Sequence, residues 1–134
     1  LKKQIVENDT NINDVKYIDS LLDHYLALSV THPDIYGQLN HYSQLVAANA
    51  FLKTRDIEKA SKRLVESCTY DGFILKSFGP NMMVAKRFLE EGHQAPVIEF
   101  LQNCQSYWYD RKAYIWEEEI SNGTMPDFGE NLNY

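Results

Sequence analysis

The sequence predicts an all-α protein, and three observations lead to this prediction. Apolar residues recur every three or four positions over most of the 134 residues, which is the spacing of one helix face. Glycine, proline and aspartate stand where these runs begin or end. No segment alternates apolar and polar residues long enough to indicate a strand with a partner. A chain of this length fits a single domain of about six helices.

The first predicted helix spans 13–31 and flanks the rest of the domain. Pro33 ends it, because the residue before a proline is disfavoured in the helical region. The apolar positions of this segment follow the helical period: Val15, Ile18, Leu21, Leu22, Tyr25 and Leu28.

The first predicted hairpin of two antiparallel helices spans 34–68. A long helix runs to about Thr54, and Asp56 is placed to cap the second helix by accepting a hydrogen bond from a free backbone N–H. The segment 70–79 that follows has glycines at positions 72 and 79, which favours a loop; a short strand is the alternative, although it would have no obvious partner. We expect its short apolar run, Phe73 to Leu75, to anchor this loop in the core.

The second predicted hairpin spans 80–107, with Gly92 as the left-handed residue that ends its first helix. Pro96 falls in the first turn of the next helix, where its missing N–H has no cost. Asp110 is expected to cap a last helix over 110–121. The tail, 122–134, is predicted to be extended, and we expect its apolar residues to pack back onto the helices: Met125, Phe128 and Leu132.

The two hairpins share a pattern when the chain is shifted by 37 residues. Two helices that pack closely need a small residue at the crossing and large apolar residues on either side of it. The shift places like residues at these positions: Ala48 on Ala85, Phe51 on Phe88, Leu52 on Leu89, and Leu64 on Leu101. The chain therefore carries two copies of one helical unit.

This pattern resembles the tetratricopeptide repeat, in which a small residue, an aromatic three positions later, a short turn, an alanine and a large apolar residue recur. The resemblance covers 42–107 and implies hairpins stacked as a short superhelix. The period is longer by three residues here, the tryptophan-leucine-glycine opening is absent, and Val97 replaces the alanine of the second helix. A plain antiparallel bundle is the alternative. The segments 78–82 and 120–129 are also similar to a group of poorly characterised bacterial proteins, which implies no activity.

Composition excludes several classes of function. The net charge of −6 argues against binding to nucleic acid, which requires clustered Lys and Arg. No stretch approaches the roughly 20 apolar residues that span a bilayer. No signal peptide is visible, so we expect a cytoplasmic protein; export stays open because the sequence begins at Leu1. Cys68 and Cys104 are expected to be buried thiols in a reducing compartment, with a single bridge in an exported protein as the alternative.

The sequence contains no catalytic, phosphate-binding or dinucleotide-binding motif, and we expect no catalytic residue and no cofactor. The favoured function is a non-catalytic interaction module that binds a protein or peptide, in an undetermined oligomeric state. Aromatic residues are typical interface anchors, and a polar residue on the long helix can face a groove. The candidate partner-binding residues are Tyr36, Tyr42, Asn49, Tyr107, Trp108, Tyr109 and Tyr114.

Two alternatives remain for this set of residues and for the chain. Trp108 and the nearby Trp116 could instead cover the end of the helical stack. The chain could also be a small helical metal-binding protein or enzyme that uses His24 and His41, or it could hold a small molecule in a pocket lined by Met82 and Met83.

Overall fold

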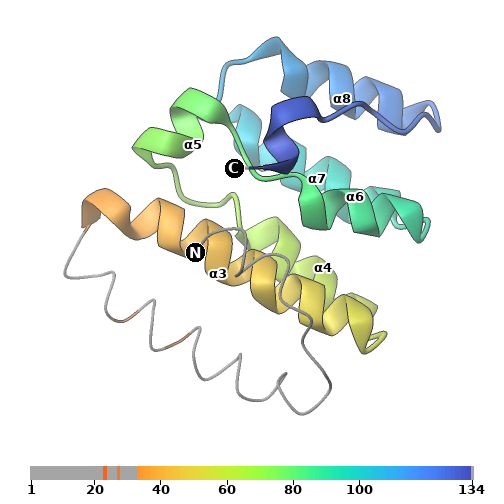
Figure 1. Ribbon diagram of the computed structural model, residues 1–134, viewed down its shortest axis with the longest axis horizontal. Helices are drawn as coiled ribbons and strands as arrows, with labels where there is room; N and C mark the ends of the chain where they lie inside the picture. The colour runs from red at the N-terminus through yellow and green to blue at the C-terminus, as the bar shows by residue number, and fades with distance from the viewer. Residues whose placement is uncertain (1–22, 24–26, 28–32, 134) are drawn as a thin grey trace.

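The computed structural model describes residues 33–133 together with residues 23 and 27 (Figure 1). Within these residues it consists of six α-helices and one short 3-10 helix, without a strand. The predicted all-α class is confirmed. The predicted flanking helix, 13–31, lies outside the described residues except for Asp23 and Ala27, which are both helical and exposed.

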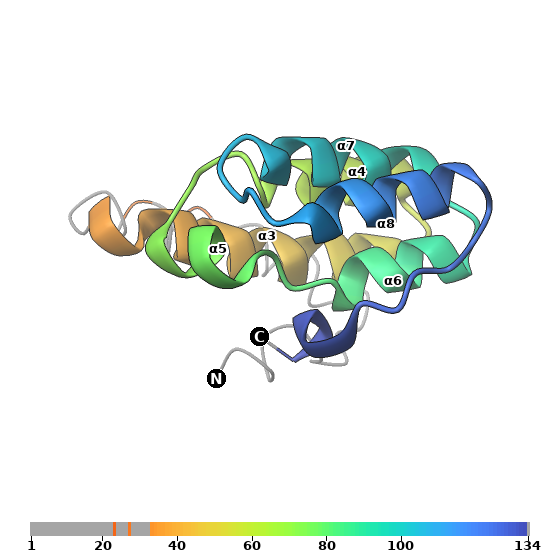
Figure 2. The same ribbon diagram turned by 90° about the horizontal axis from the view of Figure 1, so that it is seen from above.

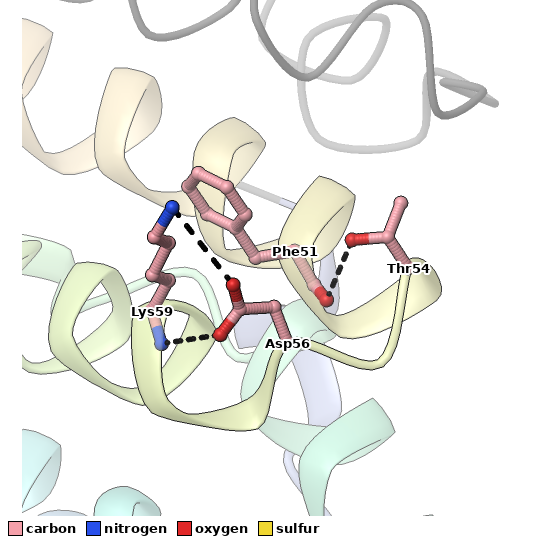
Figure 3. A network of polar contacts seen from close by, with 4 residues as sticks. All are labelled: Phe51, Thr54, Asp56 and Lys59. Carbon is pink, nitrogen blue, oxygen red and sulfur yellow. Dashed lines mark hydrogen bonds and ion pairs between the residues drawn. The ribbon is translucent and has the colours of Figure 1, made fainter.

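The first pair of helices is α3 (Pro33–Lys53) and α4 (Ile57–Glu66), which run antiparallel and pack along each other (Figure 1). The turn between them is drawn in Figure 3. The Asp56 carboxylate accepts a hydrogen bond from the Lys59 backbone N–H at 3.2 Å, so the predicted cap is confirmed. The Lys59 ammonium lies 4.0 Å from the same carboxylate and 5.5 Å from the centre of the Phe51 ring.

Replacing Asp56 by alanine should lower the free energy of unfolding by about 1 kcal/mol, because the first turn of α4 loses its side-chain acceptor. Urea unfolding followed by circular dichroism measures this loss. Lys59→Ala is the matched control: it removes the exposed ammonium with its ion pair and its contact with the Phe51 ring, and we expect a loss of no more than about 0.5 kcal/mol. Equal losses in the two variants would show that the cap has no special role.

The segment 70–79 is helical where a loop was predicted. Helix α5 (Phe73–Phe78) is bounded by Gly72, which is extended, and Gly79, whose φ is +81°. A helix of six residues is too short to show a helical period in the sequence. The expectation of three buried anchors is also wrong, because only Leu75 is buried, whereas Phe73 is 80% exposed.

The second pair of helices is α6 (Met83–Glu90) and α7 (Gln94–Gln105), followed by α8 (Arg111–Ser121). Gly92 has a φ of +85° and Asp110 accepts a hydrogen bond from the Lys112 N–H at 2.9 Å, so both predicted helix boundaries are confirmed. Helix α7 packs between α4 and α8, and α6 packs against α3 and α7. Figure 2 shows α4 and α7 along one side of the molecule and α3, α5 and α6 along the other.

The core runs through both pairs of helices. At the helix crossings, Ala48, Ala60 and Ala85 are fully buried, as the repeat pattern predicts for its small residues. The large residues around them form one cluster: Leu45, Leu64, Phe88, Phe100 and Leu101. None of the helices in this described part is long and apolar enough to cross a bilayer.

The C-terminal segment folds back onto the helices and ends in a 3-10 helix, η1 (Gly129–Leu132), where an extended tail was predicted. The Phe128 ring packs edge-on against Trp116, with centroids 5.1 Å apart. Asn131 is buried, and its side-chain amide donates hydrogen bonds to the carbonyls of Phe78 and Pro80 at 2.9 and 3.1 Å. The expected packing of the tail is confirmed for Phe128 and Leu132 but not for Met125, which is exposed.

Candidate functional site

The seven candidate partner-binding residues differ in how deeply their side chains are buried. Four of them have buried side chains: Tyr42, Asn49, Tyr107 and Trp108. Tyr36 is half-buried, and Tyr109 and Tyr114 are exposed. The seven side chains therefore do not form one surface, and only Tyr36, Tyr109 and Tyr114 offer area to a partner.

The buried candidates connect parts of the fold. Asn49 on α3 accepts a hydrogen bond from the Arg87 guanidinium on α6 at 2.8 Å. The ring of Trp108 lies 5.7 Å from that of Trp116 and covers Gly79, where an added Cβ would come within 2.5 Å of the indole. This contact, together with the positive φ of Gly79, requires glycine at that position. The placement of Trp108 fits the alternative that it covers the end of the helices.

Three exposed aromatic side chains lie on α5 or shortly before it. We name Tyr70, Phe73 and Phe78, with the adjacent Tyr36 of α3, the α5 surface. Phe73 is 80% exposed, and Tyr70 and Phe78 are each about half exposed. The rings of Tyr36 and Tyr70 meet edge-on at 4.9 Å, which joins this surface to the first turns of α3.

The turn before α5 packs closely against α3 at Gly37, where the missing side chain leaves room for it. A Cβ at this position would lie 1.9 Å from the backbone carbonyl oxygen of Asp71, so no other residue fits. The Asp71 carboxylate forms an exposed ion pair with Lys76 at 3.0 Å. Burial, followed by the neighbouring Tyr70, raises the pKa of the Tyr36 phenol. The α5 surface thus combines exposed aromatic rings with an exposed ion pair.

A second exposed aromatic group lies at the start of α8. Tyr109 precedes the helix and is 81% exposed, and Tyr114 and Ile115 are about half exposed on the helix itself. Tyr109 and Tyr114 are candidates that the sequence analysis identified. The α5 surface was missed, apart from Tyr36, because its apolar run was interpreted as buried; the two flanking glycines are the signal that could have indicated an exposed helical segment.

His41 is buried at the junction of both helix pairs. Its Nδ1 lies 2.9 Å from the carbonyl oxygen of Ser67, and its Nε2 accepts a hydrogen bond from the Asn81 backbone N–H at 3.0 Å. Because a carbonyl only accepts and an N–H only donates, these partners assign the proton to Nδ1. Both ring nitrogens are therefore engaged in the fold. His24, the second histidine of the metal-site alternative, lies outside the described residues.

Three side chains near His41 share one buried space: Cys68, Cys104 and Tyr107. Burial raises the pKa of the Cys104 thiol and, together with the two nearby thiols, that of the Tyr107 phenol. Burial also opposes ionisation of Cys68, but the neighbouring Cys104 thiol and the His41 imidazole outweigh it and lower the pKa of the Cys68 thiol. Among the described residues, no group of three or more His, Cys, Asp or Glu side chains is arranged to hold a metal ion.

Two surface hollows are open to solvent and are lined by both polar and apolar side chains. The larger, of about 420 Å³, lies between α4 and α7 beside Lys62, Glu66 and Glu99. A smaller one of about 240 Å³ lies near Asn49 and Arg87. Met82 and Met83 line neither: Met82 is fully buried in the core, and Met83 is half-buried against it.

No protein-family model, curated protein or solved structure matches this chain. The α5 surface and the group at the start of α8 each have one side chain that is about 80% exposed, Phe73 and Tyr109. Phe73 is the one that lies on a helix, α5, whose Leu75 is anchored in the core.

Proposed function

We propose that this protein is a non-catalytic interaction module that binds a partner protein or peptide through the α5 surface. The observation that carries the proposal is the exposure of Tyr70, Phe73 and Phe78 within nine consecutive residues. Exposed clusters of large apolar side chains mark interaction sites in soluble proteins. Tyrosine and other aromatic residues are also frequent among the side chains that dominate binding energy.

The support beneath α5 favours binding because it holds the helix in place before a partner arrives. Leu75 is buried in the core, and Gly79 packs beneath the Trp108 indole. From the C-terminal segment, Asn131 donates a hydrogen bond to the Phe78 carbonyl. A surface fixed in this way loses little conformational entropy on binding. The partner would therefore supply apolar side chains that fit between rings, as on one face of an amphipathic helix or an apolar peptide segment.

We also propose that the two hairpins stack as a short tetratricopeptide-like unit. Equivalent small residues, Ala48 and Ala85, are fully buried, and the equivalent Phe51 and Phe88 are buried as well. The buried placement of Tyr42 and Asn49 favours binding at α5 over binding in a groove along α3. The unit then acts as a scaffold that presents α5 at one end of α3 (Figures 1 and 2).

A peptide-display selection tests the proposed function. Peptides are selected on the immobilised protein, and their dissociation constants are measured for the unmodified protein, for Phe73→Ser and for Tyr109→Ser. The two replaced side chains are matched, because they are 80% and 81% exposed. We expect Phe73→Ser to raise the dissociation constant at least about tenfold, the effect of losing a central aromatic anchor, and Tyr109→Ser to leave it unchanged.

Two outcomes would refute the α5 surface as the binding site. One is that Tyr109→Ser weakens binding while Phe73→Ser does not, which would move the site to the start of α8. The other is that no selected peptide distinguishes this protein from an unrelated helical protein. Circular dichroism of both variants checks that the fold is unchanged.

A further inference from the structure

Two thiols from different hairpins meet in the core. Cys68 follows the end of α4, and Cys104 lies on α7. Both side chains are completely buried, and the two thiols are near enough for each to affect the ionisation of the other. Helix α4 packs directly on α7, and the Asn103 side chain beside Cys104 donates a hydrogen bond to the Val65 carbonyl of α4 at 3.1 Å, so a covalent bond between these sulfur atoms would join the two hairpins where they already touch.

The surroundings of the pair are polar for a core. The His41 Nδ1 lies 3.8 Å from the Cys68 sulfur. The proton on this nitrogen also donates to the Ser67 carbonyl. The Tyr107 hydroxyl is buried against both sulfur atoms and has no well-formed hydrogen bond. The proton on His41 Nδ1 can therefore be shared between the Ser67 carbonyl and a negatively charged sulfur at Cys68.

We propose that Cys68 and Cys104 are a redox modification site: they form a reversible disulfide between the hairpins when the chain meets a low-molecular-weight disulfide such as glutathione disulfide. This proposal stands independently of binding at the α5 surface. Under this proposal the two buried thiols react with each other.

The exchange has two steps that balance. The Cys68 thiolate attacks one sulfur of glutathione disulfide, which forms a mixed disulfide and releases one glutathione thiolate. The Cys104 sulfur then attacks the Cys68 sulfur, and the second glutathione leaves as a thiolate. The protein loses two electrons and the protons of both thiols, and the glutathione disulfide takes them up to become two thiols.

The rate of this exchange depends on how readily glutathione disulfide reaches the Cys68 sulfur. Because neither sulfur is exposed, glutathione disulfide reaches Cys68 during folding or when the turn between α4 and α5 opens. Oxidation should therefore be faster during refolding than in the native protein. Once formed, the bond closes a loop of 36 residues, the difference between positions 104 and 68, and restricts the unfolded chain.

The experiment uses the full chain, refolded from denaturant in buffers that contain reduced and oxidised glutathione in varied ratio. Free thiols are blocked, and the products are analysed by mass spectrometry. We expect the intact mass to fall by the two hydrogens lost and tryptic peptides 64–76 and 88–111 to be linked. The melting temperature of the oxidised form should be higher by roughly 10 °C, and dithiothreitol should reverse the change.

Cys68→Ser and Cys104→Ser are controls in which the linked peptide cannot form. The proposal is overturned if both thiols of the unmodified protein stay free at every glutathione ratio. It is equally overturned if the products are glutathione adducts or dimers linked between chains. A linked product with a lower melting temperature would also refute it, because the bond would then not fit the native packing. None of these readouts depends on a bound partner, so failure here leaves the proposed function to its own test.

Discussion

Replacing His41 by alanine should lower the free energy of unfolding by about 4 kcal/mol, since it removes two buried hydrogen bonds and opens a cavity. The Ser67 carbonyl and the Asn81 N–H would each lose a partner inside the core. These groups belong to the end of α4 and to the start of the second hairpin, so His41 of α3 joins three parts of the chain. Urea unfolding monitored by tryptophan fluorescence and circular dichroism measures the loss.

His93→Ala is the matched control for this prediction. His93 precedes α7, its side chain makes no cap hydrogen bond there, and its ring packs edge-on against Phe88 at 6.3 Å. We expect its replacement to cost less than about 1 kcal/mol. If His41→Ala costs no more than His93→Ala, His41 does not hold the two hairpins together.

Replacing Phe128 by alanine should lower the free energy of unfolding by about 3 kcal/mol, the cost of deleting a buried aromatic ring. The ring packs on Trp116, and the residues after it place Asn131 beneath α5 and the start of α6. The Met82 backbone N–H also donates to the Asn131 carbonyl at 2.8 Å. Loss of the ring should therefore loosen η1 and, through Asn131, the support of α5.

Met125→Ala provides the comparison, because this side chain lies in the same segment but is exposed. We expect its effect to stay below about 0.5 kcal/mol. Hydrogen exchange measured on both variants adds a local test: the amides of α5 should exchange faster in Phe128→Ala and not in Met125→Ala. Unchanged stability in Phe128→Ala would mean that the C-terminal segment is not part of the cooperative fold.

The sequence predicted those helices whose signals are local. Asp56 and Asp110 cap helices because a carboxylate at that position has an N–H to accept from, whatever the rest of the fold does. Gly92 takes the left-handed conformation for a similarly local reason. The repeated small and large residues of the two hairpins identified the core, since their spacing follows the helix period.

Features that depend on distant parts of the chain were not predicted. Helix α5 has only six residues, and its orientation depends on Gly37 and on Asn131, which lie 36 or more positions from Phe73. The neighbours Trp108 and Tyr109 look alike in the sequence as aromatic candidates, yet one is buried and the other exposed. Their difference in exposure arises where α7 ends and the chain turns toward α8. No local sequence pattern predicts this difference.

The same reasoning applies to His41. Its sequence neighbours give no sign that both ring nitrogens are used, because the partners lie 26 and 40 positions away. From the sequence alone, His41 is a candidate metal ligand. Its two backbone partners show that it is part of the fold. Long-range hydrogen bonds of this kind are visible only once the helices are assembled.

The central claim is that a partner binds at the α5 surface, and backbone amide chemical shifts test it most directly. The isotope-labelled protein is titrated with a peptide from the display selection, and the shift changes are mapped onto the described residues. The account predicts the largest changes at residues 70–78 and at Tyr36, with little change at 109–115. The largest changes at 109–115, with residues 70–78 unaffected, would contradict it.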